Sequence, residues 1–189
     1  MKKNTAALFR MFLMLFLFCA GCSSVPYDRD DYKKAMRGSD LKGADLSGAD
    51  LRGRDLRSAN LTGSSMRGAD LSGSNLREAF LVRVDLTGSR LNNANLEGAD
   101  LSGSKLGKAD LTGANLSNAN LSGVDLRGAR LFNTDLSDSF LYRADLSNTE
   151  IKDVRLKNAN LGGAIISKKW KGLIERSGAL NYSAIVWVE

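Results

Sequence analysis

The sequence predicts a solenoid, in which the chain coils around one narrow core. Leucine recurs every five residues from Leu41 to Ile166, at 26 positions of which 23 are Leu and the others Met or Ile. On an α-helix, successive leucines would turn by about 140° and scatter around the cylinder. On a straight strand, alternate leucines would face opposite sides. All of them reach one core only if the chain bends once in every five residues.

The residue two places before each leucine completes the predicted core. This position holds Ala 14 times and Ser 6 times, with Val, Thr and one Arg in the remainder. Alternating small and large side chains fill a narrow interior without voids. The exception, Arg54, is expected to turn outward near the open first coils. Two residues after leucine, Gly or Asn is common, and both suit a corner with positive φ.

The repeating unit carries a family resemblance. "ADLSG" at 44–48 and "ANLSN" at 114–118 resemble the pentapeptide-repeat family, and the match spans about residues 38–168. The resemblance implies an all-β fold, a right-handed quadrilateral β-helix with one pentapeptide per side and twenty residues per coil. About six and a half coils would make a rod roughly 30 Å long at the ~4.8 Å spacing of neighbouring strands.

Residues 1–21 are predicted to be a signal peptide. Basic residues precede an apolar run at 11–18 that is too short to span a bilayer. The following Ala-Gly-Cys22 resembles the cleavage box of bacterial lipoproteins, which implies a lipid on Cys22. Ser23 and Ser24 come next, and by resemblance to lipoproteins of two-membrane bacteria this implies an outer-membrane location facing the periplasm. A plain secreted protein with an ordinary thiol is the alternative.

Removal of the signal peptide changes the charge and the cysteine chemistry. Basic residues fall from 27 to 24 against 21 acidic ones, so the net charge falls from +6 to about +3. No free thiol remains, which excludes a disulfide framework. A nucleic-acid binder concentrates basic residues on one face, whereas here they are spread along the chain, so no nucleic-acid partner is expected. Residues 22–37 are predicted to be a tether, although Met36 could instead cap the first coil.

Residues 169–189 are predicted to close the end of the core, because solenoids need capped ends. Apolar residues at helical spacing around Trp170 and Ile174, followed by Gly178, indicate a short amphipathic capping helix. The last stretch, "SAIVWVE", alternates like a strand. Family members often dimerise through C-terminal elements, which makes Trp187 a candidate dimer contact. Burial of Trp187 within one chain is the alternative.

The composition argues against an active site. The chain has no histidine, so the commonest general base and metal ligand is missing. Asp recurs with the repeat, and the glycines come at corners rather than in a phosphate loop. The protein is therefore expected to be no enzyme and to bind no metal or cofactor besides the lipid. A catalytic or calcium site built from ladders of Asp is the alternative.

Two segments depart from the polar outer pattern. "AFLVRVDL" at 79–86 and "SFLYRADL" at 139–146 are 60 residues apart, which is three coils, so they should lie on the same side. Exposed apolar groups beside arginine are typical of interaction surfaces, and tolerated surface variation is the alternative. The candidate partner surface comprises Phe80, Val82, Arg83, Phe140, Tyr142 and Arg143.

The favoured function is a non-enzymatic envelope lipoprotein that acts as a rigid scaffold or protein-interaction rod for an unknown partner. The alternative resembles the quinolone-resistance pentapeptide proteins, which are cytoplasmic dimers that imitate DNA and bind gyrase. The export signal and the balanced charge argue against it. Self-association of the rods fits the sequence equally well.

Overall fold

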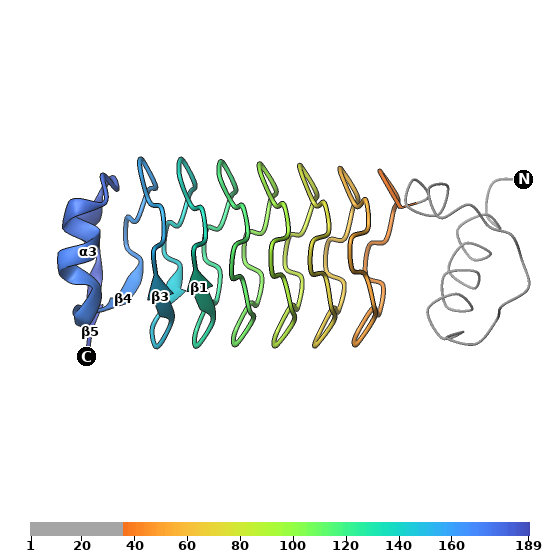
Figure 1. The fold of residues 1–189 in the computed structure, drawn as a ribbon, viewed down its shortest axis with the longest axis horizontal. Coiled ribbons are helices and arrows are strands. Elements are labelled where there is room, and N and C mark those ends of the chain that lie inside the picture. Colours follow the sequence, from red (N-terminus) through yellow and green to blue (C-terminus); the bar gives the residue numbers. More distant parts are fainter. Residues whose placement is uncertain (1–35) are drawn as a thin grey trace, which may run out of the picture.

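The computed structural model describes residues 36–189, which form a straight stack of coils with a helix at one end (Figure 1). Parallel bridges join residues twenty apart, from Asp40–Asn60 to Asn160–Leu180, and they fall on four ladders. Each coil therefore has four sides of five residues. This arrangement agrees with the predicted all-β solenoid, and the right-handed sense of the coil stays a prediction. The signal peptide, Cys22 and residues 23–35 of the tether lie outside the described residues.

Each pentapeptide makes the same backbone hydrogen bonds. Leu41 donates its N–H to the carbonyl of Asn60 on the next coil (2.7 Å), and Asn60 donates back to Ser39 (2.9 Å). Ala44 donates to the carbonyl of Leu41 (3.0 Å) and so closes the corner. Because every coil satisfies its neighbour in this way, the sheet-like sides need no long strands.

The core is the column of leucines that the repeat predicted. From Leu51 to Leu141 these side chains are at most 1% exposed, and the small residues between them are buried as well. Met36 is also buried, on the same register, so the regular core already begins there. Arg54 is half-buried, and its N–H donates to the carbonyl of Leu51 as other inward residues do. The inward register therefore continues through Arg54.

The predicted corner conformation is confirmed. Glycine two places after leucine has a φ of about +65°, as at Gly123, where an added Cβ would meet no atom within 4 Å. Asn takes the same left-handed conformation at several corners, and so do longer side chains such as Glu78, Arg83 and Lys108. At most corners the residue type is therefore selected by backbone conformation, whereas a Cβ on Gly113 would also clash with the Oδ1 of Asn93.

The last coils contain the longer elements. β1 pairs with β3, and β4 lies between β2 and β5, all in parallel. The helix α3 lies across the end of the stack (Figure 1) and buries Ile174 against the core, and Gly178 follows with a positive φ. The short capping helix is therefore confirmed. The elements are β1 Arg130–Phe132, β2 Asp145–Leu146, β3 Glu150–Lys152, β4 Ile165–Ser167, the 3₁₀ helix η1 Lys168–Trp170, α3 Lys171–Arg176, the 3₁₀ helix η2 Tyr182–Ala184 and β5 Val186–Val188.

Candidate interaction surface

Three of the four sides, which we call the charged faces, carry acidic and basic residues that pair with one another. They are the ladders that begin at Asp45, Asp50 and Asp55. Arg127, for example, lies 2.7 Å from Asp125 on its own coil and 3.8 Å from Asp145 on the next coil. All ion pairs of the coils that join described residues lie on these three faces. Most arginines of the charged faces thus lie beside a carboxylate of the same face.

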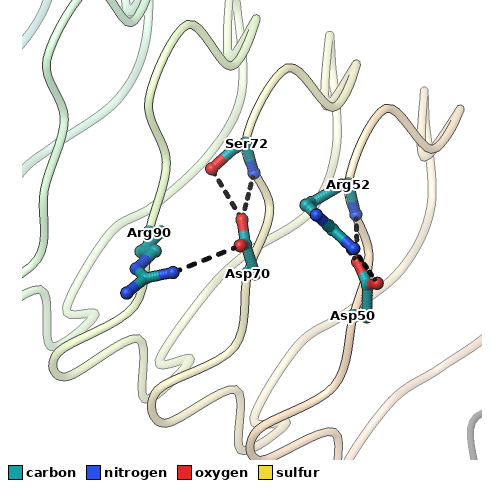
Figure 2. A network of polar contacts seen from close by, with 5 residues as sticks. All are labelled: Asp50, Arg52, Asp70, Ser72 and Arg90. Atoms are coloured by element: carbon teal, nitrogen blue, oxygen red, sulfur yellow. Dashed lines mark hydrogen bonds and ion pairs between the residues drawn. The ribbon is translucent and has the colours of Figure 1, made fainter.

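Figure 2 shows this pairing on the charged face that begins at Asp50. Arg52 donates to the Asp50 carboxylate from Nε (2.8 Å) and from a terminal nitrogen (2.6 Å), and these bonds lower the pKa of Asp50 to about 2. On the next coil, Ser72 donates its N–H and its hydroxyl to Asp70 and lowers the pKa of that carboxyl. Arg90, one coil further, lies 3.7 Å from Asp70. A general acid needs a raised pKa, which neither carboxyl has.

The Asp or Asn before each leucine has a structural role that sequence reasoning missed. Its Oδ1 accepts the N–H of the residue two places on, at 3.0 Å from Asp100 to Ser102 and at 3.1 Å from Asn120 to Ser122. This N–H takes part in neither the coil-to-coil nor the corner hydrogen bonds of the backbone. Asp and Asn favour this local bond, and their recurrence at one repeat position was the signal that could have predicted it.

The Asp ladders are therefore explained by folding, which weakens the alternative of a catalytic or calcium site. Within residues 36–189, no three His, Cys, Asp or Glu side chains gather closely enough to hold a metal ion.

The fourth side, which we call the aromatic face, differs from the other three. Phe80 and Phe140 share its ladder three coils apart, as the sequence predicted, and both are 53% exposed. Tyr142 is 48% exposed, whereas Val82 is half-buried. The ladder of the aromatic face consists of Asp40, Asn60, Phe80, Asp100, Asn120, Phe140, Asn160 and Leu180.

Sequence reasoning did not include Leu180 in this surface. Of the six large apolar side chains that are exposed among the described residues, four lie on the aromatic face, and Leu180, at 50% exposed, is the fourth. It lies beyond the end of the regular repeat, in the segment predicted to be a cap, although it is still twenty residues after Asn160. Its bridge to Asn160 brings it onto the ladder.

Arg83 and Arg143 occupy corners of the aromatic face in the left-handed conformation, with φ of 54° and 56°. The Arg143 guanidinium lies 5.1 Å from the centre of the Tyr142 ring. A Cβ placed on Gly103 or Gly163 would lie 3.6 or 3.3 Å from the Cγ of the arginine one coil before. Both arginines thus extend over the next coil. Neither forms an ion pair with a carboxylate among the described residues, in contrast to the arginines in Figure 2.

Trp187 lies in β5, opposite Ile166 of β4, and is half-buried against the core. This position fits packing within one chain and leaves part of the ring exposed. Its role as a dimer contact stays a prediction.

Cys22, the predicted lipidation site, lies outside the described residues. No helix within the described part of the chain is long and apolar enough to cross a membrane.

Comparison with solved structures finds several pentapeptide-repeat proteins. HetL, a protein involved in heterocyst differentiation regulation from the cyanobacterium Nostoc sp. strain PCC 7120, is 31% identical, with 79% of this chain and 70% of HetL covered and a TM-score of 0.43. Rfr23 from the cyanobacterium Cyanothece 51142 is also 31% identical, with 62% and 87% covered and a TM-score of 0.44. A trypsin-treated form of QnrB1, a plasmid-mediated fluoroquinolone resistance protein, is 17% identical, with 82% and 85% covered and a TM-score of 0.40.

A search of curated proteins found no significant match. The family model for pentapeptide repeats matches the chain with eight copies, at residues 36–57, 55–93, 94–131 and 125–163. These matches cover more than half of the sequence and coincide with the coils. The chain therefore belongs to the pentapeptide-repeat family.

Proposed function

We propose that this protein is a non-enzymatic lipoprotein of the cell envelope, whose coils form a rigid scaffold or interaction rod. The observation that carries the proposal is that one side of the coils differs from the other three in its side chains. On three sides, most arginines form ion pairs with acidic residues of the same side. The aromatic face presents exposed aromatic rings beside arginines without carboxylate partners among the described residues. Such an uneven surface is typical of binding rather than of catalysis.

The absence of catalysis is supported by the chemistry of the carboxylates. Asp50 and Asp70 have lowered pKa values because neighbouring side chains donate hydrogen bonds to them. They are therefore held in the ionised form that the coils need and do not titrate near neutral pH.

The proposed anchor is a lipid on Cys22, and the proposed location is the outer membrane facing the periplasm. Both rest on the resemblance of residues 1–24 to lipoprotein signals. The partners are then the membrane, an unknown protein and, through Trp187, a second copy of the chain. No nucleic-acid partner is proposed, because the arginines of the charged faces are paired with acidic residues.

The alternative function, a DNA-mimicking protein that binds gyrase, requires an acidic face. The charged faces instead intersperse acidic and basic residues, as on the ladder Asp70, Arg90, Asp110 and Arg130. This mixture favours the envelope proposal.

Fatty-acid labelling in cells tests the anchor, with wild type, Cys22→Ser and Cys19→Ser compared side by side. We expect wild type and Cys19→Ser to take up label and to appear in the membrane fraction, because Cys19 leaves with the signal peptide. Cys22→Ser should take up none. An unlabelled wild type in the cytosol would contradict the proposal and would make gyrase protection the leading function.

A further inference from the structure

We infer that the aromatic face rests on the lipid bilayer itself, in a headgroup layer that contains anionic lipid, so that the rod lies along the membrane. The inference deepens the proposed function and rests on it in one respect, namely that the lipid anchor holds the rod at the surface. The charged faces then point to the aqueous side.

The side chains of the aromatic face suit a membrane interface. Phe80, Phe140 and Leu180 are each about half exposed and are spread over five coil steps. Apolar side chains at such positions enter the boundary between headgroups and acyl chains. Tyr142, whose ring has an apolar body and a polar tip, belongs to the residue types enriched at that depth.

The charges of this face complement an anionic surface. From Asn60 onward the ladder holds one acidic residue, Asp100, whereas Arg83 and Arg143 stand at the corners without carboxylate partners among the described residues. Small uncharged residues, such as Ser122, separate the aromatic segments. Arginine side chains can keep their stems on apolar surface while the guanidinium reaches a phosphate.

The corner conformation makes these two arginines costly to the fold. The other corners of the aromatic face, such as Gly103 and Gly123, are glycines, which adopt positive φ without steric penalty. Arginine in the same conformation destabilises the corner. Glu78 and Lys108 carry the same cost at corners of the charged faces, so the two arginines are distinguished by their place, in the coils that carry Phe80 and Phe140.

The dimensions of the face favour a bilayer over a protein. One side of a coil is roughly 10 Å wide, and the five steps from Phe80 to Leu180 extend about 24 Å. This strip covers about 240 Å² in projection, which is small for a stable protein interface, where each partner buries roughly 800 Å² of accessible surface. A planar bilayer needs no such area, because a tether converts weak contacts into an intramolecular event.

Photo-crosslinking distinguishes a lipid bilayer from a protein as the occupant of the aromatic face. p-Benzoylphenylalanine replaces Tyr142 on the aromatic face or, as the matched control, Phe132 on the opposite side. Phe132 also lies one residue after a buried leucine and beside an arginine, Arg130. Both proteins are irradiated in cells and in vesicles of phosphatidylcholine and phosphatidylglycerol. We expect several-fold more phospholipid adduct at position 142 than at 132. Protein adducts at 142 in place of lipid adducts, or equal lipid adducts at both positions, would overturn the inference.

The arginines are tested in the same vesicles by Arg143→Gly, with Lys108→Gly as the control. Lys108 has the same charge and the same left-handed corner on a charged face, so glycine fits both sites without strain. Loss of one arginine near an anionic surface should lower the lipid adduct of a crosslinker at Phe140 about fivefold, and Lys108→Gly should leave it unchanged. An equal loss in the two variants would overturn the role of the arginine.

These outcomes separate the inference from the anchor. Lipid adducts on a chain that takes up no fatty-acid label would refute the lipid anchor on Cys22 and support the contact between the aromatic face and the bilayer. Fatty-acid label on a chain that forms only protein adducts would support the anchor and refute the contact with the bilayer.

Discussion

At the scale of the residue, the fold depends on the conformation of the corners. Gly123 has a φ of 65° and open space around the position where a Cβ would lie. Glu78 takes a φ of 56° at an equivalent corner. The left-handed region favours glycine over residues with a Cβ by about 1 kcal/mol. The same backbone position therefore holds both relaxed and strained residues along the rod.

Gly123→Ala should lower the free energy of unfolding by about 1 kcal/mol, and Glu78→Gly should raise it by about as much. The physical reason is backbone strain alone at Gly123, because no atom lies within 4 Å of the added Cβ. Denaturant unfolding followed by circular dichroism measures both. A stabilising Gly123→Ala would show that the corner is not left-handed in solution.

At the scale of the element, the C-terminal segment both caps the core and leaves an edge. The helix α3 covers the end with Ile174, and β5 adds the last strand next to β4. Among the described residues, β5 pairs on one side only. An unpaired strand edge is a template for pairing with another chain, and Trp187 lies on that strand half-buried.

Trp187→Ala should weaken the proposed dimer roughly thirtyfold, because a tryptophan at the centre of an interface carries about 2 kcal/mol or more. Sedimentation velocity over a concentration series measures the association. Trp170→Ala is the control, since Trp170 is also half-buried in the cap but lies in η1 and not on the unpaired strand edge. A wild type that is monomeric at every concentration would leave Trp187 with a packing role only.

At the scale of the whole molecule, the rod is held by many equivalent ladders and by carboxylates that the fold keeps ionised. Hydrogen bonds from Arg52, Arg57 and Arg127 are the largest cause of the lowered pKa values of Asp50, Asp55 and Asp125. For Asp110, burial opposes the lowering, and hydrogen bonds from Thr112 and other donors exceed it. The folded chain therefore releases these protons more readily than the unfolded chain.

The sign of the pH dependence follows from this difference. A carboxyl whose pKa is lower in the folded chain than in the unfolded chain stabilises the fold at pH values above its unfolded pKa of 3.8. This stability is lost as the pH falls through the folded pKa, which is about 2 for Asp50. The denaturant midpoint should therefore be level from about pH 7 to 5 and should fall between about pH 4 and 2. Asp50→Asn should reduce the fall. A midpoint that is unchanged at pH 2 would contradict the role of the carboxylates.

Much of this architecture was predictable from the residues. A period of five with Leu41 and its successors required one bend per repeat, and small residues such as Ala44 indicated a narrow core. Each coil repeats the same pattern of buried leucine, small inward residue and corner, so the local sequence pattern and the overall fold agree along the whole rod. Leu180 was not predicted, because η1 and α3 interrupt the pentapeptide pattern before it, although its bridge to Asn160 keeps the twenty-residue spacing.

Sequence alone was sufficient for the coil, the core and the corners, because each depends on contacts between residues close in the chain or at a fixed spacing, and the export signal stays a prediction. The division into three self-paired faces and one aromatic face required the structure. Residues 20 apart, such as Asp110 and Arg130, meet only when the coils stack. Which charges find partners is therefore a property of the stacked ladders, and the contrast between paired Arg130 and the exposed corner at Arg143 emerges only there.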